Sequence, residues 1–205
     1  MGGPLAERTP SPGDARDAVE ARRGPLSREA WIAAARRTLE AKGVAQVKID
    51  RVARELGVTR GSFYFHFQDL RDLQDCLQDE WRRCNVEPFH RLSCQEVGDG
   101  QAFIDRVTDT WVRENPFSPL LDLAIRDWAR SAPALAAEFK AADELRMSLL
   151  SRALEAMGYE SDESLVRARI TYLHQIGYYA LGFRESRAER ERLLPFYRRV
   201  LVGQS

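Results

Sequence analysis

A small residue and a glycine four positions apart, just before a short aromatic segment, constrain this chain most. Ala53 allows two short helices to cross closely, and Gly57 accepts the positive φ that a tight turn between them requires. The apolar positions that would fix their crossing angle are Val52, Leu56, Val58 and Phe63. The pattern predicts a helix-turn-helix, with the Thr59 side chain capping a second helix of about two turns.

The second predicted helix carries side chains that suit contact with DNA. A short helix fits the major groove, where an arginine can donate two hydrogen bonds to guanine and a ring can contact a thymine methyl group. We therefore expect Arg60 and Phe65 to read bases, and Gly61 to permit a close approach of the backbone.

The stretch from Ser27 to Trp81, and above all Leu56-Gly57-Val58-Thr59-Arg60-Gly61-Ser62-Phe63-Tyr64-Phe65-His66-Phe67, resembles the amino-terminal domain of the TetR family of bacterial transcriptional regulators. The resemblance implies that Tyr64 and His66 grip phosphates, which give affinity and register rather than specificity. Packing or capping by these two side chains is the alternative. The expected DNA-binding residues are Lys48, Thr59, Arg60, Gly61, Ser62, Tyr64, Phe65 and His66.

Two positions depart from the family's pattern. Val47 stands at the start of the second helix, where family members often have Thr or Ser. Leu70 stands where Lys or Arg commonly follows the His-Phe-x-Asp run. Arg71 is next along the chain, but on a helix its direction differs by about 100°. These departures leave open a helical small-molecule-binding protein whose DNA contacts have weakened.

The distribution of charge agrees with a DNA-binding segment near the amino terminus. Lys plus Arg and Asp plus Glu both number 31, so the net charge of zero gives no global attraction to nucleic acid. Between Ser27 and Phe67, however, eight basic residues stand against four acidic ones. The bases are Arg28, Arg36, Arg37, Lys42, Lys48, Arg51, Arg54 and Arg60, and the acids are Glu29, Glu40, Asp50 and Glu55.

We expect three parts along the chain. Residues 1–25, rich in Pro, Gly and Ala without periodicity, predict a disordered arm, whose Arg22-Arg23 pair can either enter the minor groove or remain solvated. Residues 26–68 are the expected helix-turn-helix domain, with Ser27 capping its first helix and Gly43 ending it. Residues 69–205 are the expected effector-binding and dimerisation domain.

Apolar residues at steps of three and four predict helices throughout this second part. One helix is expected through Phe103 and Trp111. The expected starts or caps of the others are Asp69, Ser118-Pro119, Pro133, Ser161, and Ser186 with Glu189 in a capping box. Pro195 should kink or restart the last helix. No strand pattern occurs, so the expected class is all-α.

Large rings spread over several of these helices are candidates for the effector cavity that the resemblance implies, with plain core packing as the alternative. His174 and Gln175 are polar residues inside an apolar stretch, and they need partners across a subunit interface or from a ligand. The expected lining is Phe103, Trp111, Phe117, Trp128, Phe139, Tyr172, His174 and Tyr178.

The stretch from Ile170 to Leu181 is apolar on nearly every face, which implies burial on both sides, one of them against a second subunit. A short recognition helix contacts only a few base pairs, so two copies on a palindromic operator are expected. The expected interface, on helices from about Asp162 to Gly203, is Ile170, Leu173, Ile176, Gly177, Ala180, Leu181, Phe196 and Val200.

Several classes of protein are disfavoured by what the sequence lacks. Its three cysteines have no CxxC spacing and fit a reducing cytoplasm better than a redox or thiolate metal site. Its three histidines lack metal-ligand spacing, and no nucleophile motif occurs, so we expect neither enzyme nor cofactor. No apolar run has the length of a membrane span, and no signal core begins the chain, so we expect a cytoplasmic protein without a membrane partner.

The sequence thus predicts a sequence-specific DNA-binding transcriptional regulator, a homodimeric repressor released from double-stranded operator DNA by a small-molecule effector. An architectural DNA binder that needs no effector is a further alternative.

Overall fold

The computed structural model describes residues 26–183 and 185–203, and within them it contains helices and no strand. The predicted all-α class is confirmed. The α-helices are α2 (Arg28–Lys42), α3 (Ile49–Leu56), α4 (Leu70–Trp81), α5 (Glu87–Ser93), α6 (Gly100–Arg113), α7 (Pro119–Ala129), α8 (Pro133–Ala156), α9 (Ser161–Ala180) and α10 (Arg187–Leu201). Two 3-10 helices, η1 (Val44–Gln46) and η2 (Arg60–Phe65), and one π-helix, η3 (Arg82–Val86), connect them. The predicted arm at residues 1–25 lies outside the described residues.

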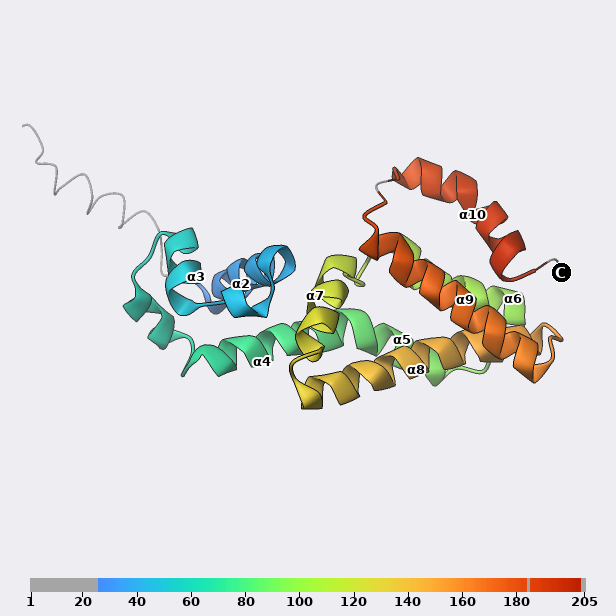
Figure 1. The fold of residues 1–205 in the computed structure, drawn as a ribbon, viewed down its shortest axis with the longest axis horizontal. Coiled ribbons are helices and arrows are strands. Elements are labelled where there is room, and N and C mark those ends of the chain that lie inside the picture. Colours follow the sequence, from blue (N-terminus) through green and yellow to red (C-terminus); the bar gives the residue numbers. More distant parts are fainter. Residues whose placement is uncertain (1–25, 184, 204–205) are drawn as a thin grey trace, which may run out of the picture.

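The molecule is elongated, with the amino-terminal helices at one end and α6, α9 and α10 at the other (Figure 1). α4 runs from the amino-terminal end toward the middle, and the chain continues through η3 into α5 without leaving the right-handed helical region. Pro88 near the start of α5 lacks the N–H that a regular helix would use, which accounts for the wider π turn before it.

Most predicted helix ends are confirmed by the capping geometry. The Ser27 hydroxyl accepts a hydrogen bond from the Ala30 amide, and the Asp69 carboxylate accepts one from the Asp72 amide. Gly57 ends α3 in the left-handed conformation with φ of 70°. Ser186 and Glu189 form the predicted capping box of α10.

Three predictions of local structure are corrected. The Thr59 side chain makes no capping hydrogen bond, because η2 is a 3-10 helix whose first turn is closed by the Thr59 carbonyl accepting from the Ser62 amide. Ser161 does not cap α9, since Glu160 occupies the cap position one residue earlier. α10 continues through Pro195, so of the two expected effects of this proline, a kink or a restart of the helix, the restart is excluded.

Two clusters of buried apolar side chains hold the fold together. The first joins α2, α3, η2 and α4 to α7 and α8, and Trp81 of α4 stacks on Phe139 of α8 with ring centroids 5.0 Å apart. The second joins α5, α6, α8 and α9 around Phe89 and Trp111. Because α7 and α8 complete the first core, the amino-terminal helices rest on the body of the molecule.

Candidate DNA interface and interior polar sites

The segment after Gly57 is anchored by one aromatic side chain while its neighbours face solvent. Phe63 is fully buried, with its ring edge-on to Trp31 at 5.3 Å and stacked on Phe67 at 5.1 Å. Tyr64 and Phe65, the next two residues, are 53% and 87% exposed. Burial of Phe63 therefore fixes η2 on the core and turns the following rings outward.

Most of the other expected DNA-binding residues are exposed as well. Lys48, Thr59, Arg60 and Gly61 are exposed, whereas Ser62 and His66 are partly buried. The Arg60 guanidinium lies 3.4 Å from the Asp50 carboxylate, and a hydrogen bond with Tyr64, followed by the charge of Asp50, raises the pKa of Arg60. Arg60 is thus a charged donor held beside α3.

An arginine that the sequence did not single out braces the end of this segment. Arg28 donates from Nε to the His66 carbonyl at 3.4 Å, and its Nη2 lies 3.2 Å from the Asp72 carboxylate. Its guanidinium also lies over the Phe67 ring, 4.8 Å from the centroid. These contacts tie the turn after η2 to the starts of α2 and α4. The only signal in the sequence was that Arg28 follows the cap of the first helix.

The two departures from the family pattern are apolar side chains that face the protein interior. Val47 is buried in the first core, and Leu70 packs against it. Both side chains thus stabilise the fold and offer no group to phosphate.

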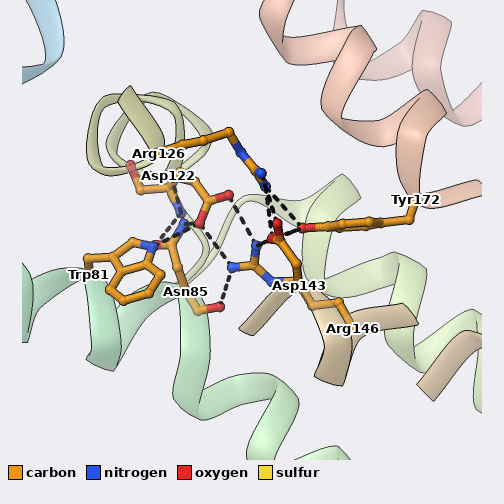
Figure 2. Close-up of polar contacts among 8 residues, drawn as sticks. Trp81, Asn85, Asp122, Arg126, Asp143, Arg146 and Tyr172 are labelled. Atoms are coloured by element: carbon orange, nitrogen blue, oxygen red, sulfur yellow. Dashed lines mark hydrogen bonds and ion pairs between the residues drawn. The ribbon is translucent and has the colours of Figure 1, made fainter. Parts of the chain in front are cut away.

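A buried polar cluster links five elements that follow residues 26–68 in the chain (Figure 2). We define it by its labelled residues: Trp81 of α4, Asn85 of η3, Asp122 and Arg126 of α7, Asp143 and Arg146 of α8, and Tyr172 of α9. Two arginines and two carboxylates give it no net charge.

Asp122 and Arg146 form the centre of the polar cluster. Asp122 accepts from Trp81 Nε1 at 2.9 Å, from Asn85 Nδ2 at 3.2 Å and from Arg146 Nη2 at 2.9 Å. The Arg146 side chain is 1% exposed. Burial lowers its pKa, but Asp122 and the Tyr172 hydroxyl outweigh this effect and hold the pKa above its usual range.

Asp143, Arg126 and Tyr172 form the other half of the cluster. Both terminal nitrogens of Arg126 donate to Asp143, at 2.8 and 2.9 Å, and the Tyr172 hydroxyl donates to Asp143 at 2.6 Å. Burial, reinforced by the Asp143 carboxylate, raises the pKa of Tyr172 to about 12. Tyr172, expected to line an effector cavity, is therefore committed to hydrogen bonds inside the protein.

The four charged members of this cluster were not predicted from the sequence. A usable signal existed, because Arg146 follows Phe139 by seven residues and Ala142 by four, which places it on the apolar stripe of α8. A charged residue on an apolar stripe requires a buried partner.

The space beside the polar cluster is nearly full, and a larger cavity lies under α10. The first space, lined by Phe117, Arg146 and Tyr172 among others, has a volume of about 10 Å³. The second, between α6, α9 and α10, has a volume of about 70 Å³. Three of the expected effector residues, Trp111, His174 and Tyr178, line this second cavity.

The remaining expected effector residues do not reach the cavity under α10. Phe103 and Phe117 are buried in the second core, and Phe139 and Trp128 belong to the first core. Phe139 is held there by stacking on Trp81 and by the Arg126 guanidinium, 4.4 Å from its centroid. Spacing along a helix identified these rings as inward-facing without showing which interior space they fill.

Most of the expected interface residues face solvent in the single chain. Ile170, Leu173, Ala180 and Leu181 of the α9 region and Phe196 and Val200 of α10 are exposed. Ile176 and Gly177 are partly buried, and Ile176 packs against the second core. An apolar face thus remains uncovered on α9 and α10.

Other kinds of site are limited within the described part of the chain. Cys76, Cys84 and Cys94 are free thiols, and burial raises the pKa of Cys76. No group of three or more His, Cys, Asp or Glu side chains there is arranged to hold a metal ion. Of the helices described, none combines the length and apolar character that crossing a membrane requires.

Comparison with known proteins assigns the amino-terminal part. Residues 32–74 match the profile of the family described as bacterial regulatory proteins, tetR family. The match covers most of α2, all of α3 and η2, and the start of α4, which are the elements that present Arg60, Tyr64 and Phe65. No solved structure matches the chain. The helix-turn-helix geometry and this match together identify residues 32–74 as a DNA-binding segment of the TetR family type, and the chain as a DNA-binding regulator of transcription.

Proposed function

We propose that this regulator is a homodimeric repressor that reads a palindromic operator through the segment from Lys48 to His66 and leaves it when a small effector binds. The observation that carries the DNA-reading part is the exposure of Tyr64 and Phe65 beside the fully buried Phe63. Two adjacent exposed rings suit a contact with DNA, because the DNA backbone offers phosphates to a tyrosine and the major groove offers thymine methyl groups to a phenylalanine.

Charge supports the same assignment of residues. Lys48 and Arg60 are exposed, and His66 is partly buried. We propose that Arg60 and Phe65 contact bases, that Gly61 lets the backbone approach, and that Lys48, Tyr64 and His66 contact phosphates. Thr59 and Ser62 complete the surface at the start of η2.

The uncovered apolar face supports a dimer. Leu173 is 65% exposed on α9, and Phe196 and Val200 are exposed on α10. A second copy of the chain would cover these side chains and place two η2 segments on one face of DNA. We propose residues 26–68 as the reading domain and residues 69–205 as the part that pairs subunits and binds the effector.

A chain of polar contacts supports coupling between these two parts. Arg36 of α2 donates to the Ser118 hydroxyl at 2.6 Å, and the Ser118 backbone bonds the Asn85 side chain in both directions, at 2.9 and 3.3 Å. Asn85 belongs to the polar cluster that ends at Tyr172 on α9. Movement of α9 relative to α7 would thus be transmitted to α2. Repression is the proposed default, because such an effector favours the conformation that fits DNA less well.

The test of DNA reading uses the exposed side chains. Tyr64→Ala and His66→Ala should each weaken binding to the DNA upstream of the chain's own gene, by about the same factor on all sequences, because phosphate contacts give affinity without specificity. Phe65→Ala should instead weaken the preference for the upstream site over unrelated DNA. Fluorescence anisotropy at several salt concentrations measures both effects.

Glu163→Gln, on the far part of α9, is the matched control and should leave both quantities unchanged. Unchanged binding in all three variants would remove η2 from the interface. If the unmodified protein binds neither its upstream DNA nor unrelated duplexes, the competing proposal, a helical binding protein whose DNA contacts have weakened, replaces this one.

A further inference from the structure

We propose that the cavity under α10 binds a small, neutral aromatic compound that carries a carbonyl oxygen. This inference rests on the proposed function in one respect, since we assign this compound as the effector that releases DNA.

The cavity has the walls of a site for a flat ring. Trp111 of α6, Tyr178 of α9 and Tyr197 of α10 line it, together with the His174 imidazole, whose centroid lies 4.7 Å from that of Tyr197. One water needs roughly 10–15 Å³, so 70 Å³ has room for about five water-sized groups, the scale of a single small ring. Burial lowers the pKa of His174, which favours the uncharged imidazole, and its ring adds a further flat face to the lining.

Three polar groups in the lining have no hydrogen-bond partner among the residues that the structure describes. They are Thr171 Oγ1, Gln175 Nε2 and Arg198 Nε, and all three residues line the cavity. Thr171 is only 6% exposed, so bulk water does not satisfy its hydroxyl. The two nitrogens can only donate, and the hydroxyl can donate as well. A ligand that satisfies them must offer hydrogen-bond acceptors, and a carbonyl oxygen, with two lone pairs, can accept from two of them.

The charges around the cavity favour a neutral acceptor over a carboxylate. Arg190 pairs with Glu114 at 2.5 Å, and Arg198 pairs with Asp105 at 3.0 Å. Glu185 adds a third carboxylate to the surroundings and accepts from the Tyr178 hydroxyl at 3.2 Å. Both arginines are therefore already neutralised, and burying another anion here would carry a desolvation cost without a free cation to offset it.

The position of the cavity links its occupant to the proposed subunit interface. α10 contributes Leu194, Tyr197, Arg198 and Leu201 to the cavity wall. The same helix exposes Phe196 and Val200 on the other side. A ring inserted under α10 would shift this helix, and with it the apolar face that we assign to the partner subunit.

The experiment compares three single-ring probes of similar size by ligand-observed NMR titration of the full chain. Acetophenone has a carbonyl acceptor and no charge, ethylbenzene has no acceptor, and benzoate has a charged one. We expect acetophenone to bind about three- to tenfold more tightly than either of the others, the contribution of one or two hydrogen bonds. No binding of acetophenone, or equal or tighter binding of ethylbenzene or benzoate, would overturn the proposal.

Two variants place the probe in this cavity. Thr171→Val and Gln175→Met keep the side-chain size but remove the unpartnered groups, so each should weaken acetophenone binding about threefold or more while leaving Tm unchanged or higher. Thr110→Val on α6 is the matched control, because its hydroxyl bonds the Arg106 carbonyl and lies outside the cavity wall. Unchanged acetophenone affinity in the two cavity variants would show that the probe binds elsewhere and would overturn the assignment.

A final measurement separates the ligand from the function. Adding acetophenone at saturation should lower the affinity for upstream DNA in the unmodified protein and not in Thr171→Val at the same concentration. If acetophenone binds as expected and DNA affinity does not change, its assignment as effector fails while the site stands. DNA binding without any probe tests the DNA-reading part of the proposed function independently.

Discussion

At the scale of single residues, two phenylalanines of η2 differ completely in burial. Phe63 is buried between Trp31 and Phe67, whereas Phe65 two residues later is almost fully exposed. A 3-10 helix has three residues per turn, so side chains two apart point in different directions. The core thus determines the direction in which the side chains that we propose to read DNA point.

A substitution at Gly61 should affect DNA binding without affecting stability. A Cβ atom there would lie 3.8 Å from its nearest neighbour, Thr59 Oγ1, and the backbone is not in the left-handed region. Gly61→Ala should therefore leave the free energy of unfolding within about 0.5 kcal/mol of the unmodified value. It should nevertheless weaken operator binding about tenfold, if the backbone approaches DNA closely here. Urea unfolding and anisotropy measure the two effects, and unchanged binding would contradict a close approach at this position.

Arg146 is the residue whose removal should harm the fold most. Its substitution by Met leaves the Asp122 carboxylate buried with only Trp81 and Asn85 as donors. Breaking a buried pair in this way costs about 3–5 kcal/mol. We expect Arg146→Met to lower the free energy of unfolding by this amount in urea titrations.

The matched control is Lys140→Met on the same helix, which breaks the exposed pair with Glu144. It should change stability by about 0.5 kcal/mol or less. Equal losses in the two variants would show that the polar cluster does not stabilise the fold.

At the scale of elements, the sequence predicted where helices occur better than it predicted whether a helix is α or 3-10. Helices begin after Ser27, Asp69 and Ser186 and end at Gly57, as the capping chemistry of these residues predicted. The 3-10 character of η2 was not predictable, because it depends on how Phe63 seats against Trp31 from another helix. Tertiary packing selected the tighter turn.

The link between α8 and α9 through Tyr172 should give a measurable dependence on pH. Burial raises the pKa of Tyr172 to about 12 from its ordinary value of 10, so folding favours the protonated phenol. Its contribution to stability is therefore fully present below pH 10 and is lost as the pH rises from 10 to 12.

Tyr172→Phe should consequently show a shallower fall of the free energy of unfolding between pH 10 and 12 than the unmodified protein. The fall should not vanish, because Tyr179, whose pKa burial also raises to about 12, contributes in the same range. Urea unfolding at intervals across this range provides the test. Parallel pH profiles for the two proteins would contradict burial of the Tyr172 hydroxyl in the folded state.

At the scale of the whole molecule, the sequence predicted a candidate site only where the residues of that site are close together in the chain. The exposed segment after Gly57 is encoded within about ten residues, and its surface position followed from them. The polar cluster draws on residues from Trp81 to Tyr172, and the cavity under α10 on residues from Thr108 to Val202. Contacts between side chains so far apart depend on how helices pack, which periodicity alone does not specify.

The uncovered apolar face leads to a prediction about assembly. Leu173→Glu should convert a dimer into a monomer in sedimentation velocity, because a charge would have to be buried without a partner at the interface. Its helical content should be unchanged, since Leu173 faces solvent in the single chain. Leu120→Glu on α7, where the leucine is 62% exposed, is the control and should remain dimeric. A Leu173→Glu dimer would exclude this face of α9 as the contact between subunits.

The central claim is that two copies of one short segment read DNA together. The most direct measurement is to sequence the genomic DNA fragments that the purified, unmodified chain retains at moderate salt. We predict that the retained fragments share an inverted repeat whose half-sites lie about one helical turn, or a small multiple of it, apart. Retention of no duplex even at low ionic strength, or of fragments without any shared repeat, would contradict the account.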